Sequence, residues 1–406
     1  MEIIAPQRVT LRELFRIPAF AVLFPAEVVS VLGSQLAKFA LSVLVFDRTN
    51  SATAAALTYA TSFLPSIIGG LALARLGDRF ARRTVMITAD TSRAVLFLAM
   101  AIPSMPLWAV IVLLVVAVVI EPAFTSAEVS FLADALAPER FRAATAVRAT
   151  SNQMLQVIGF AIGGAVVVLI RPSGALVVDA ASFVLSAALI AVALREPDRV
   201  HRSSPGPGVA PSARFAGLWR DDRTRIYMAF TVLVGLFVLP EALAVPFGAQ
   251  IGASTVETGV LLSMIPLGGA VGALLIVRVQ PGRRLGIARW MAVLCGLPLL
   301  ASGWQPVWPV ACVCWFVSGV LTAYQVEATT VLVRTIPQRD RARLIGVVSS
   351  WLVGSQGVGF AVGGVLAHFI GPGESIAWAA AGGCVAAVVV VVASVAGVRQ
   401  TASAST

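Results

Sequence analysis

The chain has 406 residues, of which 58% are apolar and only 12% are charged, and its formal net charge is +10. A soluble domain is about half apolar and a quarter charged, so this chain lacks the polar surface of a water-soluble globule. A membrane-spanning helix takes ~20 apolar residues, and twelve such helices need ~240, close to the apolar content here. A secreted disulfide scaffold, a nucleic-acid-binding domain and an ordinary cytosolic enzyme are all disfavoured.

Charged residues, glycines and prolines divide the apolar sequence into twelve expected helices. In chain order they cover residues 18–46, 52–76, 84–103, 107–133, 143–170, 173–194, 226–249, 256–278, 285–303, 307–333, 343–370 and 375–398. The expected fold is therefore an all-α membrane protein with twelve transmembrane helices. The expected domains are a cytoplasmic N-terminus (1–17), a six-helix bundle (18–194), a cytoplasmic linker (195–225), a second six-helix bundle (226–398) and a cytoplasmic tail (399–406).

The distribution of arginine predicts the orientation of these helices. With the N-terminus in the cytoplasm, the cytoplasmic segments hold 25 arginines and the outside loops hold two, Arg48 and Arg171. Cytoplasmic loops of membrane proteins are enriched in Lys and Arg, so both termini are expected in the cytoplasm and no nucleic-acid partner is needed to explain the charge. The amino-acid composition is typical of a GC-rich bacterial genome. Together with the twelve expected helices, it predicts a multi-pass protein in the lipid bilayer of a bacterial inner membrane.

A repeat relates the two halves of the chain. The segment Gly-Phe-Ala-Ile-Gly-Gly at 159–164 recurs as Gly-Phe-Ala-Val-Gly-Gly at 359–364, an offset of 200 residues. The repeat predicts two pseudo-symmetric bundles related by an axis along the membrane normal. Glycines let helices approach closely, so packing explains them at least as well as contact with a substrate does; they are Gly159, Gly163, Gly164, Gly359, Gly363 and Gly364.

Residues 70–83 read Gly-Leu-Ala-Leu-Ala-Arg-Leu-Gly-Asp-Arg-Phe-Ala-Arg-Arg. They are similar to the loop signature of the Major Facilitator Superfamily, with Ala81 in place of a glycine, and the chain resembles that superfamily over nearly its whole length. The segment at 159–164 resembles a drug/proton antiporter motif, with Phe160 in place of proline. Residues 89–93 and 179–183 look like the branch that contains macrolide-efflux proteins and the bacterial enterobactin exporter.

The resemblance implies roles for the loop signature. Asp78 would lie against the N-terminal end of the eleventh helix, where the helix dipole favours an anion, and would hold the inner side closed. Arg79, Arg82 and Arg83 belong to the same inner gate, and Arg82 is expected to pair with Asp134. Membrane topology alone accounts for the arginines but not for Asp78.

Ionisable residues inside apolar spans are costly and are therefore functional candidates; they are Glu27, Lys38, Asp90, Arg93, Glu121, Glu128, Arg148, Asp179, Glu241 and Glu327. Asp90 and Arg93 are three residues apart and are expected to pair within their helix. By the repeat offset, Glu241 lies at the level of Lys38, and an ion pair between them is hypothesised to close the outside.

Two further groups of these residues are given roles. Glu128 and Glu327 occupy matching positions near the cytoplasmic ends of their helices, and ion pairs with Arg148 and the loop arginines at the inner gate are expected. A carboxylate buried away from water takes up a proton more readily. Glu27, Glu121 and Glu241 are the candidates for proton coupling, with purely structural carboxylates as the alternative.

The sequence thus predicts a secondary active transporter that works by alternating access. The expected function is proton-coupled efflux of a lipophilic or amphipathic small molecule, such as a drug, a natural product or a siderophore. A nutrient importer on the same fold and a non-transporting membrane sensor remain as alternatives. No enzyme activity, cofactor or metal is expected, since the four cysteines fall in apolar runs and the chain has two histidines; a monomer is expected to suffice.

Overall fold

The computed structural model describes residues 10–73, 80–194, 222–335 and 341–403, and within these ranges every regular element is helical. The first half contains α1 (Leu11–Phe15), α2 (Pro18–Thr49), α3 (Ala52–Ala60), α4 (Leu64–Leu73), α6 (Arg82–Met100), α7 (Leu107–Ala135) and α8 (Pro138–Ala193). The second half contains α10 (Asp222–Val232), α11 (Val234–Phe237), α12 (Leu239–Gln250), α13 (Thr255–Arg278), α14 (Pro281–Leu294), η1 (Pro298–Trp304), α15 (Trp308–Leu321), α16 (Tyr324–Thr335), α17 (Arg341–Ile370) and α18 (Pro372–Ser403).

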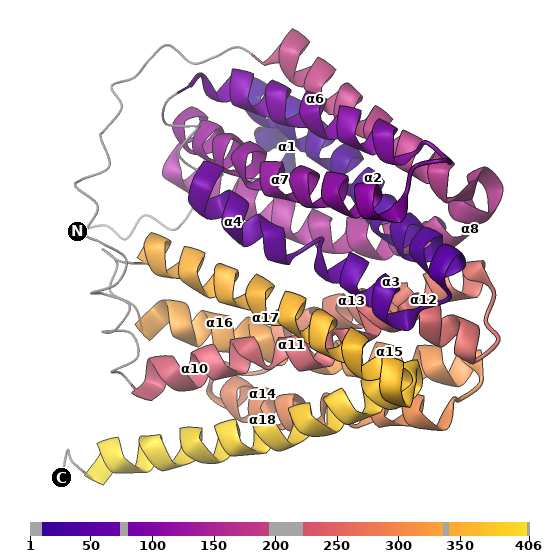
Figure 1. Ribbon diagram of the computed structural model, residues 1–406. Helices are drawn as coiled ribbons and strands as arrows, with labels where there is room; N and C mark the ends of the chain where they lie inside the picture. Colours follow the sequence, from indigo (N-terminus) through magenta and orange to yellow (C-terminus); the bar gives the residue numbers. More distant parts are fainter. Residues whose placement is uncertain (1–9, 74–79, 195–221, 336–340, 404–406) are drawn as a thin grey trace, which may run out of the picture.

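The two halves form two layers of long, roughly antiparallel helices. Figure 1 shows the first half, from indigo to magenta, lying over the second half, from salmon to yellow. We call the end of the molecule where α2 begins and α18 finishes the terminal end; it lies on the left in Figure 1. The expected linker lies mostly outside the described residues, in 195–221.

The expected spans each have a helical counterpart, although several are interrupted. Among the described residues, nine helical segments are long and apolar enough to cross a membrane. One of them, the 56-residue α8, contains two helices, because Arg171 has a non-helical conformation (φ 62°, ψ 164°) and Pro172 follows it. The span expected at 52–76 is divided into α3 and α4, and α6 falls outside the nine because it is rich in charged residues.

Prolines account for much of this interruption. Pro65 stands at the second position of α4, Pro240 near the start of α12 and Pro298 at the start of η1. Proline has no backbone N–H to donate and clashes with the preceding turn, so a helix ends before it and a new one begins with it. The resulting breaks in the seventh and ninth spans lie within otherwise continuous apolar segments.

A shared apolar core joins the two halves. Buried aromatic residues of the first half, among them Phe39 and Phe160, belong to the same cluster as Phe247, Trp315 and Phe360 of the second half. Phe247 and Trp315 stack with ring centroids 5.6 Å apart. In a chain expected to span a membrane, close van der Waals packing rather than removal from water holds helices together, so the packing of this cluster joins the halves.

Of the repeated glycines, Gly164 and Gly364 make symmetric contacts between the halves, whereas the other four pack against their own half. A Cβ added to Gly164 would stand 2.6 Å from the carbonyl oxygen of Thr255, and one added to Gly364 would stand 2.5 Å from the Cβ of Ala56. The two partner positions differ by about the same offset as the glycines themselves. Thr53 also donates a hydrogen bond to the carbonyl oxygen of Gly364 at 2.8 Å. The two halves therefore meet closely beside Gly164 and Gly364. We call this end of the molecule, opposite the terminal end, the closed end.

Polar contacts between the halves follow the same distribution. Among the described residues, three side-chain hydrogen bonds cross from one half to the other: from Thr53 to Gly364, from Tyr59 to Glu241, and from Gln153 to Pro266. The first two lie toward the closed end, and Gln153 lies midway along the first helix of α8. Two of these three hydrogen bonds between the halves therefore lie toward the end opposite the termini.

Candidate functional site

Arg148 of α8 is the centre of a buried ion-pair network in the first half. Its Nε donates to Glu27 of α2 at 2.5 Å, and its Nη2 donates to Glu27 at 3.1 Å and to Glu128 of α7 at 2.5 Å. Asn152, one turn further along α8, also donates to Glu27, at 3.1 Å. As whole residues, Glu27 and Glu128 are 8% and 2% exposed. One guanidinium therefore ties three helices together and serves two carboxylates.

A second group of charged residues lies on α6 and α7. The guanidinium of Arg93 stands 4.0 Å from the ring centroid of Phe183 and 3.9 Å from a carboxylate oxygen of Glu121. Asp90, one turn away, forms no ion pair with Arg93 in the described part of the chain, and neither of its carboxylate oxygens has a hydrogen bond. The expected pair within α6 is therefore absent, because Arg93 turns toward α7 and α8 instead.

A small cavity lies beside this second group. Its volume is about 40 Å³, and its polar lining is formed by Lys38 and Ser34 of α2, Ser62, Arg93 and Glu121. A liquid water molecule takes up ~30 Å³, so the cavity has room for a water molecule. Of the three carboxylates expected to couple protons, Glu27 is buried and Glu121 and Glu241 are partly exposed, with the Glu121 side chain 47% exposed.

Lys38 and Glu241 lie near each other without forming a direct ion pair. The Lys38 ammonium stands 5.4 Å from the ring centroid of Phe63, and it acts electrostatically on both Asp179 and Glu241. Glu241 accepts a hydrogen bond from the hydroxyl of Tyr59 at 3.2 Å. Tyr59 therefore makes the direct contact that the sequence hypothesis gave to Lys38, because its ring extends from α3 across the interface between the halves.

The loop signature is partly visible. Asp78 and Arg79 lie outside the described residues. Arg82 contacts the carboxylate of Asp134 and donates to the carbonyl oxygen of Ser130. Arg83 donates to carbonyl oxygens near the end of α8, where a cation interacts favourably with the helix dipole. These contacts fix the start of α6 against the ends of α7 and α8.

The second half lacks a counterpart to the Arg148 network in the described part of the chain. Glu327 of α16 is partly buried and forms no ion pair with a described residue. The two halves therefore share their backbone plan and glycine contacts but differ in the placement of charge.

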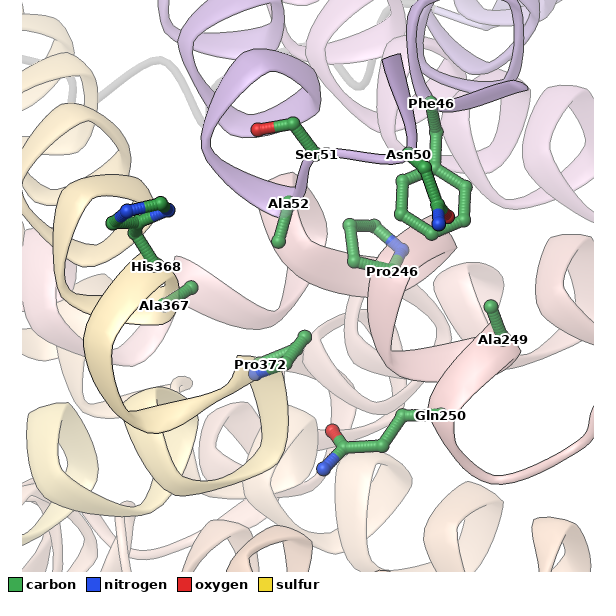
Figure 2. Close-up of a pocket in the computed structure, with 10 residues that line it drawn as sticks. All are labelled: Phe46, Asn50, Ser51, Ala52, Pro246, Ala249, Gln250, Ala367, His368 and Pro372. Carbon is green, nitrogen blue, oxygen red and sulfur yellow. The ribbon is translucent and has the colours of Figure 1, made fainter. Parts of the chain in front are cut away.

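A pocket opens at the closed end between the halves. Its volume is about 430 Å³, and its polar lining comprises Asn50 and Ser51 from the first half and Gln250 and His368 from the second. Figure 2 shows these side chains on segments that lie far apart in the sequence. Because both halves contribute walls, the pocket has this shape only while the closed end is closed.

Two polar partners in these sites, Asn152 and Tyr59, were not among the sequence candidates. Both are uncharged, and only ionisable residues within apolar spans were candidates. Helical spacing identifies Asn152, since it lies one turn beyond Arg148 on the same face of the helix. Tyr59 is one of three tyrosines in the chain, in an otherwise apolar span.

Comparison with known proteins finds a family model and a curated relative that agree with each other. The family model described as Major Facilitator Superfamily matches residues 23–279. The multidrug efflux pump Tap of Mycobacterium tuberculosis is 28% identical over 377 residues, which cover 87% of this chain and 88% of that protein.

Solved structures show the same fold at low identity. A bacterial homologue of the human lysosomal transporter Spinster, inward-facing and occupied, has a TM-score of 0.70 at 15% identity and covers 92% of this chain and 93% of its own. A POT family transporter in complex with a thioalcohol-conjugated peptide has a TM-score of 0.75 at 12% identity, with 92% and 95% covered. These neighbours are transporters, and the family model spans more than half of the chain. The chain therefore belongs to the Major Facilitator Superfamily and is a multi-pass membrane transporter, not an enzyme.

Proposed function

We propose that this transporter exports lipophilic or amphipathic small molecules in exchange for protons. The observation that carries the proposal is the Arg148 network, in which two buried carboxylates, Glu27 and Glu128, share one guanidinium. The network has one negative charge in excess when both acids are ionised. An uncompensated charge in a membrane interior costs several kcal/mol, so binding one proton relieves that cost.

Proton binding changes the contacts of Arg148. A neutral Glu27 or Glu128 attracts the guanidinium less strongly than a carboxylate does, because the attraction between opposite charges is lost and the cation then donates to an uncharged oxygen. Arg148 lies on α8, and α8 packs against α13 of the other half at Gly164. Protonation at the network therefore biases the position of a helix that forms the interface, and two arrangements of the halves can respond to it.

The closed end supports alternating access. Substrate enters between the halves from the terminal end, and the glycine contacts and the Tyr59–Glu241 hydrogen bond bar its exit. Exit requires these contacts to separate, and the pocket at Asn50 and Gln250 marks where the path then opens. Glu241 and Glu121 lie along this path and are further candidates for binding the proton.

Orientation and substrate class are part of the same proposal. The arginine distribution favours a terminal end in the cytoplasm and a closed end outside the bacterial inner membrane. The likeness to the multidrug efflux pump Tap supports export of drug-like compounds. Each chain contains both halves of the path, so the monomer is the working unit.

Proton movement in everted membrane vesicles tests the proposal. Vesicles that contain the full chain are energised by respiration so that their interior acidifies, and a pH-sensitive dye is followed while ethidium, erythromycin and related compounds are added. We expect at least one compound to release protons from the vesicles, and we expect Glu27→Gln or Glu128→Gln to abolish the release. Asp47→Asn, the equivalent change at an exposed carboxylate of α2, serves as the control. Absence of any response across the panel contradicts proton-coupled export.

A further inference from the structure

Asp90 is a buried carboxylate without a hydrogen bond in the described part of the first half. Its side chain is fully buried, with 0% exposed, and neither carboxylate oxygen has a hydrogen-bond partner among the described residues. An ionised carboxylate without hydrogen bonds in a low-dielectric environment is strongly unfavourable. Buried charges in proteins are normally paired or hydrogen-bonded, so this arrangement needs an explanation.

The groups around Asp90 do not supply a counter-charge at contact distance. Arg93 on the same helix acts on Asp90 electrostatically, but its guanidinium is directed to Phe183 and Glu121. Ser186 of α8 faces Asp90 beyond hydrogen-bond distance, and its hydroxyl has no hydrogen bond in the described part of the chain. Glu128 of α7 also acts on Asp90 electrostatically, and it is an acid. A carboxylate near Asp90 favours a neutral Asp90, because like charges repel at short range.

The charge balance of this region leads to the same result. The region contains the cations Lys38 and Arg93 and the acids Asp90, Glu121, Asp179 and Glu241. If all are ionised, the acids outnumber the cations, and proton binding reduces the excess of negative charge. Among the described residues, Asp90 is the acid of this group whose two oxygens both lack a donor, whereas Glu121 meets Arg93, Asp179 accepts from serine hydroxyls and Glu241 accepts from Tyr59.

We propose that Asp90 carries a bound proton in this conformation and releases it when Arg93 turns from Glu121 to Asp90. The O–H bond of the carboxylic acid breaks, the proton passes to water in the cavity beside Arg93, and the carboxylate left behind pairs with the guanidinium. The reverse step restores the present arrangement. The proposal extends the proposed proton coupling, since it adds a second proton site to that of the Arg148 network.

Infrared spectroscopy of the purified full chain tests the protonation of Asp90 without a substrate. A protonated carboxyl has a C=O stretching band that a carboxylate lacks, and the band of a buried acid persists at neutral pH. We expect Asp90→Asn to remove one such band and the control Asp47→Asn to leave it. An unchanged band in folded Asp90→Asn overturns the proposal.

A second measurement on the unmutated protein guards against loss of folding in the variant. Protein grown with aspartate labelled with ¹³C in its side-chain carboxyl shifts the band of a protonated aspartic acid and leaves that of a glutamic acid in place. We expect a shifted band. A spectrum with no shifted band in the protonated region shows that no aspartate is protonated and overturns the proposal whatever the variant does.

The vesicle assay separates this inference from the proposed function. If the Asp90 band is present but no compound moves protons, proton-coupled export fails while the protonation of Asp90 stands. If compounds move protons and Asp90→Asn moves them as well as Asp47→Asn does, the Asp90 site has no part in coupling and the inference fails. We expect Asp90→Asn to lose the proton release.

Discussion

Replacing Arg148 by glutamine removes the cation that Glu27 and Glu128 share. The variant keeps a hydrogen-bonding side chain of similar length and leaves two carboxylates facing each other in a buried site. Since the side chains of Arg148, Glu27 and Glu128 are 12%, 10% and 3% exposed, water cannot replace the lost partner.

The burial of the pair sets the size of the effect. Removing one partner of a buried ion pair costs about 3–5 kcal/mol, because the remaining charge is left uncompensated. The ion pair of Arg82 and Asp134 gives the matched comparison, with side chains 24% and 57% exposed. An exposed pair contributes about 0–1 kcal/mol, so we expect Arg82→Gln to change the free energy of unfolding far less than Arg148→Gln does.

Equilibrium unfolding by SDS in mixed micelles measures both variants, with tryptophan fluorescence as the signal, since Trp315 is fully buried. We expect the triple variant Arg148→Gln, Glu27→Gln, Glu128→Gln to regain most of the stability lost by Arg148→Gln, because the three amides carry no charge. If Arg148→Gln costs no more than Arg82→Gln, or if the triple variant is less stable than Arg148→Gln, the reasoning about the network is refuted.

Two further predictions concern the closed end. Gly164→Val should force the halves apart, so that a cysteine introduced at Ser51 reacts faster with a membrane-impermeant maleimide. The control Gly382→Val should not change the rate, since a Cβ added to Gly382 meets no described atom within 4 Å. Equal labelling rates in the two variants would contradict the close packing at Gly164. Tyr59→Phe removes the donor to Glu241 and should cost about 1.5–3 kcal/mol of closed-end stability, seen as the same rise in maleimide labelling. Tyr324→Phe removes a buried hydroxyl that has no hydrogen bond to a described residue and should leave labelling unchanged. A rise of equal size would exclude a specific role for Tyr59.

The sequence predicts those features that depend on local spacing or on average composition. The Ser-x-x-Glu spacing of Ser254 and Glu257 predicts a capping box, and both of its hydrogen bonds are present at the start of α13. The presence of the spans follows from apolar length, because an apolar segment of ~20 residues in lipid satisfies its backbone as a helix. Contacts between helices at one depth of the membrane are harder to predict. Helical spacing gives the depth of a residue but not which neighbouring helix its side chain faces.

The charged residues show this limit most clearly. Glu27 and Arg148 are 121 positions apart, and the sequence places both near the same depth without showing that α2 and α8 present them to each other. Arg93 is within reach of Asp90 along its own helix, yet the aromatic face of Phe183 and the carboxylate of Glu121 draw it away. The interruptions of the spans show the same limit, because a proline predicts a break in a helix but not the direction in which the chain continues after it.

Transport by the purified protein in proteoliposomes tests the central claim most directly. With the terminal end on the outer surface of the liposome and the lumen made acidic, we predict that ethidium accumulates inside and that protons leave in proportion. Collapse of the pH gradient by nigericin should stop the accumulation, and Glu27→Gln should prevent it. Accumulation that proceeds at the same rate without a proton gradient, or protons that stay in place while ethidium moves, would contradict the account.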